Sequence, residues 1–138
     1  MKKYVGIWVD HEKAFIVAIQ GDTEKLTRID SNVERHVRLA GGSRSGTIYG
    51  PQDVASEQRV DRKYDHDLRK YYQNVIRVIN DAEQILIFGP GEAKKELEKE
   101  IKKSKKLALK IVGIERADKM TEGQIAAKVR KYFLADQQ

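Results

Sequence analysis

A short turn between two regular segments is the first place in the sequence that could bind a ligand. Gly89-Pro90-Gly91 joins an apolar run, residues 84–88, to a helical pattern with Lys94 near its start. Backbone N–H groups at a helix start attract anions, so Gly89, Gly91 and Lys94 form a candidate anion-binding turn. The spacing of a Walker motif, Gly-x-x-x-x-Gly-Lys-Ser/Thr, is absent. The alternative is structural, because glycines also let a strand and a helix pack closely.

Asp10 follows the first apolar segment and could be a metal ligand or a turn residue. Two-metal nucleases need several carboxylates around ions about 4 Å apart, and no acid follows residues 84–88 before Glu92. We therefore expect neither a metal nor another cofactor, and interpret Asp10 as a turn residue. Three histidines, at positions 11, 36 and 66, lie far apart in the sequence, and we expect them at the surface.

Basic residues gather in two segments that could contact a polyanion. Aromatic rings interleaved with basic side chains can stack on RNA bases and neutralise phosphates. The alternative places Tyr64 and one of Tyr71 and Tyr72 in the core, with the lysines on a solvated helix end. The candidate RNA-binding residues in these segments are Arg62, Lys63, Arg69, Lys70, Lys102, Lys103, Lys105 and Lys106.

Length and composition narrow the class of protein. The 138 residues predict one domain, and 27 basic against 21 acidic residues give a net charge of +6, of which +5 lies in residues 91–138. The absence of cysteine excludes disulfides, thiolate nucleophiles and cysteine-based metal sites. The apolar runs are too short to span a bilayer, which takes ~20 residues, and no signal-peptide cleavage site follows the first one. We expect a cytoplasmic protein with no membrane partner.

The elements that must position these residues follow from hydrophobic periodicity. Residues 41–58 are rich in glycine and serine, lack an apolar period, and predict a long loop. The order β-β-β, loop, α-β-α-β-α predicts an α/β fold of the ribonuclease H-like type, a mixed five-stranded sheet flanked by helices. An antiparallel meander comes first, and right-handed crossovers make the last strands parallel to the first. The expected strands are 4–9, 14–20, 24–30, 84–88 and 107–114, and the expected helices are 59–80, 92–103 and 121–133.

Two of these segments resemble the central domain of the archaeo-eukaryotic class-1 peptide release factors and of their relative Pelota. One is Gly41-Gly42 in a long loop that feeds a basic helix with tyrosines, and the other is the strand–turn–helix unit 85–94. The resemblance covers most of the chain and implies a ribonuclease H-like domain of the translation machinery. In release factors the loop carries Gly-Gly-Gln, which promotes hydrolysis of peptidyl-tRNA in the ribosome.

The resemblance is incomplete at that motif. Ser43, followed by Arg44, stands where the glutamine is expected, and Gln52 lies later in the loop, outside the motif. By resemblance, Gly41, Gly42, Ser43 and Gln52 are the candidates for any catalytic role, and Arg44 for an RNA contact. Pelota also lacks the motif and acts in ribosome rescue without hydrolysing the ester.

Three functions remain open from the sequence. The first is a non-catalytic, translation-associated protein of the rescue, stalling or hibernation type, with the ribosome, tRNA or rRNA as partner. The second is an enzyme, a peptidyl-tRNA hydrolase in which Ser43 or Gln52 replaces the missing glutamine. The third is an interaction module, such as a homo-oligomer, without an RNA partner. Acidic residues that neutralise the lysine cluster would support it.

Overall fold

The chain forms five strands and four helices over the part that the structure describes. This computed structural model describes residues 2–33 and 51–135, with only the backbone described over 51–61 and at 135. The elements, in chain order, are β1 (Lys3–Val9), β2 (Lys13–Gln20), β3 (Thr23–Asp30), α2 (Pro51–Ile79), β4 (Gln84–Gly89), α3 (Ala93–Ile101), α4 (Lys105–Ala108), β5 (Ile111–Arg116) and α5 (Glu122–Ala135).

The strands make one mixed sheet in the order β3-β2-β1-β4-β5. The central strand β1 pairs antiparallel with β2 and parallel with β4, so that Ile7 lies beside both Ile16 and Ile87. The outer pairs are β2 with β3, antiparallel, and β4 with β5, parallel. The predicted α/β class, the meander and the parallel crossovers are confirmed.

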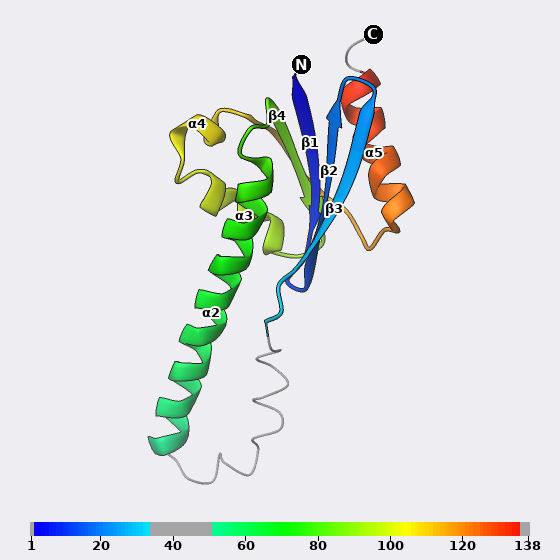
Figure 1. Ribbon diagram of the computed structural model, residues 1–138. Helices are drawn as coiled ribbons and strands as arrows, with labels where there is room; N and C mark the ends of the chain where they lie inside the picture. The colour runs from blue at the N-terminus through cyan, green and yellow to red at the C-terminus, as the bar shows by residue number, and fades with distance from the viewer. Residues whose placement is uncertain (1, 34–50, 136–138) are drawn as a thin grey trace.

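Helices cover both faces of this sheet because its central strands are apolar on both faces. Val5 and Ile7 of β1 belong to the core cluster that α2 and α3 share, whereas Trp8 packs in the cluster with Val129 and Phe133 of α5. Figure 1 shows α2, α3 and α4 on one side of the sheet and α5 on the other. The result is a three-layer arrangement in which α2 and α3 lie side by side on one face.

Two glycines are required where backbones approach closely. A Cβ on Gly6 of β1 would lie 2.3 Å from Cγ2 of Val129, so this glycine lets α5 pack against the sheet. Gly89 has a φ of +148°, and a Cβ there would lie 2.3 Å from the carbonyl oxygen of Val9. Such a contact is shorter than any packed interior permits, so both positions exclude a side chain.

The long helix α2 begins earlier than the sequence pattern indicated. It starts at Pro51 rather than at residue 59, so the predicted loop was wrong over 51–58; residues 41–50 lie outside the described part. Proline fits the first turn of a helix because its missing N–H is not needed there. The residues after it include no glycine, and a helix can form without the apolar period that the prediction relied on.

The predicted strand 107–114 was wrong at its beginning. Ser104 caps the short helix α4 by accepting a hydrogen bond from the Leu107 N–H at 3.3 Å, and the strand β5 starts only at Ile111. Leu107 is buried whereas Leu109 is 86% exposed. The apolar run therefore divides between a buried helical turn and an edge strand, which alternation alone did not separate.

The prediction that Asp10 is a turn residue is confirmed by hydrogen bonds. Oδ1 of Asp10 accepts from the backbone N–H groups of Glu12 and Lys13, both at 2.8 Å, which closes the β1–β2 hairpin. At the start of α5, Thr121 and Gln124 form a capping box: each side-chain oxygen accepts from the other residue's backbone N–H, at 2.9 and 3.1 Å.

Candidate functional site

The glycine-rich candidates are only partly within the described structure. Gly41, Gly42, Ser43 and Arg44 lie outside the described residues. Gln52 lies in the first turn of α2, where only the backbone is described. The catalytic roles suggested for these residues therefore stay predictions.

The predicted RNA-binding residues that the structure describes are all exposed, on α2 and around α4. In Figure 1, α4 lies near the end of α2 that leads into β4, at the far end of that helix from Pro51. Leu107 of α4 packs in the same core cluster as Ile79 at the end of α2. The lysines around α4 are thus held on a folded surface rather than on a free tail.

Acidic partners occupy about half of these basic groups. Lys63 pairs with Asp67 at 3.0 Å, and Lys102 pairs with Glu98 at 2.9 Å. Glu100 accepts from Lys103 at 2.7 Å and lies 3.9 Å from Arg69, which brings residues of α2 and α3 together. A separate group makes no ion pair with any described residue: Lys70, Lys105 and Lys106.

The candidate anion-binding turn is largely occupied by its own contacts. Lys94 is 8% exposed, and its ammonium donates to the carbonyl oxygen of Gly91. Gly89 is explained by its close approach to Val9, and Gly91 has a φ of +64°. These contacts favour the structural interpretation, although anion binding at the helix start stays a prediction.

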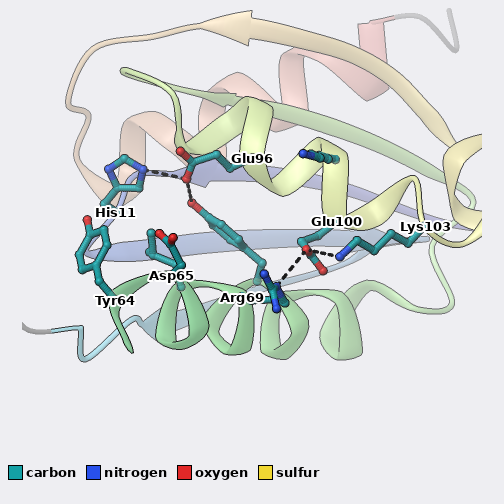
Figure 2. Close-up of a pocket in the computed structure, with 10 residues that line it drawn as sticks. His11, Tyr64, Asp65, Arg69, Glu96, Glu100 and Lys103 are labelled. Carbon is teal, nitrogen blue, oxygen red and sulfur yellow. Dashed lines mark hydrogen bonds and ion pairs between the residues drawn. The ribbon is translucent and has the colours of Figure 1, made fainter. Parts of the chain in front are cut away.

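A pocket of about 350 Å³ opens between α2 and α3, where the β1–β2 turn meets them. Figure 2 shows the side chains that surround it, from His11 and Tyr64 at one end to Glu100 and Lys103 at the other. Acidic and basic groups alternate around a floor that includes the buried Leu68 and Tyr72. The lining residues are His11, Tyr64, Asp65, Leu68, Arg69, Tyr72, Glu96, Lys99, Glu100 and Lys103.

A hydrogen-bond network fixes one end of this pocket. The Tyr72 hydroxyl donates to Oε1 of Glu96 at 2.7 Å, and Nε2 of His11 lies 2.9 Å from the same oxygen. The neighbouring Tyr71 donates to the carbonyl oxygen of Asp10 at 3.0 Å. Three elements distant in sequence, the β1–β2 turn, α2 and α3, are thereby joined.

These surroundings keep the three tyrosines protonated. Burial, and then the hydrogen bond to the Glu96 carboxylate, raise the pKa of Tyr72 far above its ordinary value. Burial, and then the charge of Asp10, raise the pKa of Tyr71 in the same way. Burial, followed by Glu96 and Asp65, raises the pKa of Tyr64 by less. None of these hydroxyls is therefore poised to act as a base near neutral pH.

The sequence pattern did not identify this network. His11 lies at the surface as expected, with its side chain 40% exposed, but its contact with Glu96 was not foreseen. His66 is exposed as expected. Both Tyr71 and Tyr72 are buried, where only one of them was expected in the core. The sequence did hold one signal for an acidic surface beside the core. Glu96 and Glu100 are one helical turn apart and therefore share a face of α3, and the neighbouring Leu97 is buried.

Two kinds of feature are absent from the residues that the structure describes. No group of three or more histidine, aspartate or glutamate side chains there could hold a metal ion. No helix in that part of the chain is long and apolar enough to cross a membrane.

Comparison with known proteins identifies the fold. No protein-family model matches the sequence, and no curated protein sequence is significantly similar to it. Among solved structures, Pelota of Thermoplasma acidophilum matches 95% of the chain at 16% identity with a TM-score of 0.52. An archaeal translation termination factor, aRF1, matches 98% at 14% identity and 0.51, and Archaeoglobus fulgidus Pelota matches 98% at 10% and 0.51.

These likenesses confirm the resemblance in fold. The chain spans 32% of the Thermoplasma Pelota chain, 40% of the archaeal termination factor and 36% of the Archaeoglobus Pelota. It therefore corresponds to one part of each of those proteins.

Proposed function

We propose that this protein is a translation-associated, RNA- or ribosome-binding protein of the rescue, stalling or hibernation type, and that it acts without hydrolysing peptidyl-tRNA. The observation that carries the proposal is the fold match along nearly the whole chain to Pelota and to an archaeal translation termination factor. A shared fold does not carry activity by itself, so the surface must supply an independent reason.

The exposed cations around α4 supply that reason. Lys105 and Lys106 are exposed and make no ion pair with any described residue, so their charge is available to a phosphate backbone. Ser104 fixes the helical turn that carries them. Paired cations such as Lys102 and Lys103 contribute less, because a phosphate must compete there with Glu98 and Glu100.

The absence of hydrolysis in this proposal rests on the sequence. Ser43 replaces the glutamine of the Gly-Gly-Gln motif, and a serine hydroxyl is shorter than the amide that the motif uses. Binding without ester hydrolysis then matches the behaviour inferred from the resemblance to Pelota.

Salt-dependent binding of purified ribosomes, or of ribosomal RNA, tests the proposal. The variant Lys105→Glu/Lys106→Glu should weaken binding at least about tenfold and flatten the plot of log K against log salt, since each lost phosphate contact removes about 0.7 to 0.9 from the slope. The matched control is Lys119→Glu/Lys131→Glu, which changes the net charge by the same amount. Both lysines are exposed; Lys119 precedes α5 and Lys131 lies within it. Equal effects of the two variants would leave only a non-specific response to net charge and would contradict the proposed surface.

A further inference from the structure

The two edge strands of the sheet, β3 and β5, carry different side chains. Each has one neighbouring strand among the described residues. Four of the eight residues of β3 are charged, and Glu24, Arg28 and Asp30 lie in ion pairs. Charged side chains discourage an edge from pairing with another chain. β5 instead begins with Ile-Val-Gly-Ile and carries its charges only at its end, on Glu115 and Arg116. It is therefore the edge better suited to accept a further strand.

The backbone of β5 directs the hydrogen-bonding groups of two residues away from β4. The Ala117 N–H donates to the carbonyl oxygen of Gly89 at 3.1 Å, so this N–H points toward β4. The N–H and C=O of one strand residue point to the same side, and successive residues alternate between the two sides. Glu115 therefore faces β4 with Ala117, whereas Ile114 and Arg116 face the outer edge. Their N–H and C=O groups are those that another strand would bind.

A bulge places exposed apolar side chains at the beginning of the same edge. The register with β4 passes from Ile111 to Gly113, which leaves Val112 outside the regular ladder and 40% exposed. Leu109, three residues earlier, is 86% exposed. These are two of the three large apolar side chains that are exposed in the described part of the chain. A strand that pairs with residues 113–116 and extends past the bulge can cover both, which adds apolar burial to the backbone hydrogen bonds.

Positive charge surrounds this edge in excess. Residues 105–119 contain two acids, and one of them, Glu115, pairs with Lys128 at 2.9 Å. Asp118 is the other acid. Four cations of the same segment are exposed and make no ion pair with a described residue: Lys105, Lys106, Arg116 and Lys119. The edge therefore favours a partner that carries negative charge.

A second copy of this chain fits the edge poorly. If two β5 strands paired antiparallel about a two-fold axis at Gly113, Lys110 of each copy would lie opposite Arg116 of the other. Like charges directly opposite each other destabilise a strand pair. The unpaired cations beside the edge add to this repulsion.

We infer that β5 accepts an extended peptide segment as a sixth strand, and that this segment carries acidic side chains between apolar ones. Strand addition at a sheet edge is a recurring mode of peptide recognition. RNA offers no ladder of alternating N–H and C=O groups, so the edge favours a peptide. Lys105 and Lys106 also belong to the RNA-binding surface proposed above, so the two partners would compete for them. The inference goes beyond the proposed function, because a peptide can bind here without a ribosome.

Hydrogen exchange of individual amides, measured by NMR on the full chain, tests the inference. The probe is a short synthetic peptide in which glutamate and valine alternate. Exchange of the Ile114 and Arg116 N–H groups should slow about tenfold when the free peptide is about tenfold above its Kd, because protection by binding follows 1 + [L]/Kd. The Glu115 N–H, which faces β4, should change little.

Two altered peptides separate the ladder from charge without changing the protein. N-methylation of every backbone nitrogen removes all the ladder donors but keeps the side chains, and should weaken binding at least about tenfold. Lysine in place of every glutamate should weaken binding as much, because like charges then meet at the edge.

A pair of variants at one position tests the edge from the side of the protein. Proline is tolerated in an edge strand where the N–H faces outward, so Arg116→Pro removes one outward donor together with the charge. Arg116→Gln removes the charge alone and is the matched control. Arg116→Pro should weaken peptide binding about three- to tenfold more than Arg116→Gln does, which is the effect of one hydrogen bond.

Several results would overturn the inference. Unslowed exchange at Ile114 and Arg116, equal binding of either altered peptide, or equal effects of the two variants would each do so. Slowing of the same two amides by a single-stranded oligouridylate would assign the edge to RNA, and slowing with protein concentration alone would assign it to a second copy. Ribosome binding is not part of this readout, so the peptide site and the proposed function can fail separately.

Discussion

The hydroxyl of Tyr72 and the carboxylate of Glu96 are joined by a 2.7 Å hydrogen bond between α2 and α3. Tyr72 is buried, and the same Glu96 oxygen lies 2.9 Å from Nε2 of His11. The bond therefore holds the long helix to the wall of the pocket and to the β1–β2 turn. It is one of the contacts that fix the side chains around the pocket.

Removing that hydroxyl should destabilise the protein modestly. Tyr72→Phe keeps the buried ring but leaves Glu96 with His11 alone, so we expect a loss of about 1 to 2 kcal/mol in the free energy of unfolding. Urea denaturation followed by circular dichroism measures it. Tyr4→Phe is the control, because the Tyr4 hydroxyl makes no hydrogen bond with a described residue; an equal loss in both variants would contradict the role given to the bond.

Stability should fall in alkaline solution through the two buried tyrosines. Burial raises the pKa of both Tyr71 and Tyr72 in the folded chain, whereas in the unfolded chain a tyrosine titrates near 10. The folded state then holds more protons, so this contribution is complete below pH ~10 and is lost as the pH rises further.

Thermal melts between neutral pH and strongly alkaline pH measure this loss. The double variant Tyr71→Phe/Tyr72→Phe should lose less stability over the interval above pH ~10 than the unaltered chain does. Tyr4→Phe serves again as the comparison. The account fails if the double variant and the unaltered chain show the same slope in that interval.

The two glycines of the 89–91 turn should respond differently to alanine. Gly89→Ala forces a Cβ to 2.3 Å from a backbone oxygen at positive φ, which we expect to cost about 3 kcal/mol or more. Gly91→Ala meets no atom within 4 Å, so only the left-handed backbone is penalised, by about 1 to 2 kcal/mol. Equal unfolding free energies for the two variants would contradict the packing interpretation of Gly89.

If the protein does not hydrolyse peptidyl-tRNA, it should not release peptide from ribosomes. Incubation with ribosomes that hold peptidyl-tRNA should release peptide at the background rate, because Ser43 replaces the motif glutamine. Gly42→Ala should leave that rate unchanged. Release above background that Gly42→Ala abolishes would instead assign a peptidyl-tRNA hydrolase.

The sheet could be predicted from the sequence because its signals are local. The β-branched runs of β1 and β2, the polar turn at Asp10 and the continuously apolar β4 all depend on nearest neighbours. The beginning of α2 could not, because a helix without an apolar period resembles a loop, and its first residue is a proline. The start of β5 was predicted wrongly because Leu107 lies in an apolar run that resembles a strand. In the structure, Ser104 caps a short helix that contains Leu107.

The pocket could not be predicted because it is made by tertiary contacts. His11 and Glu96 are 85 residues apart, and Tyr72 and Glu96 are 24 apart. No local sequence pattern predicts that His11, in a turn, and Glu96, on a helix, will lie in contact. The role of the basic residues in RNA binding stays a prediction, and the pairing of Lys102 with Glu98 and of Lys103 with Glu100 emerges only from the folded helix.

The most direct test of the central claim is sedimentation of the unaltered chain with ribosomes through a sucrose gradient at low salt. The account predicts that the protein migrates with ribosomal particles and leaves them as salt increases, because binding through phosphate contacts weakens steeply with salt. A protein that stays at the top of the gradient even at low salt would contradict it.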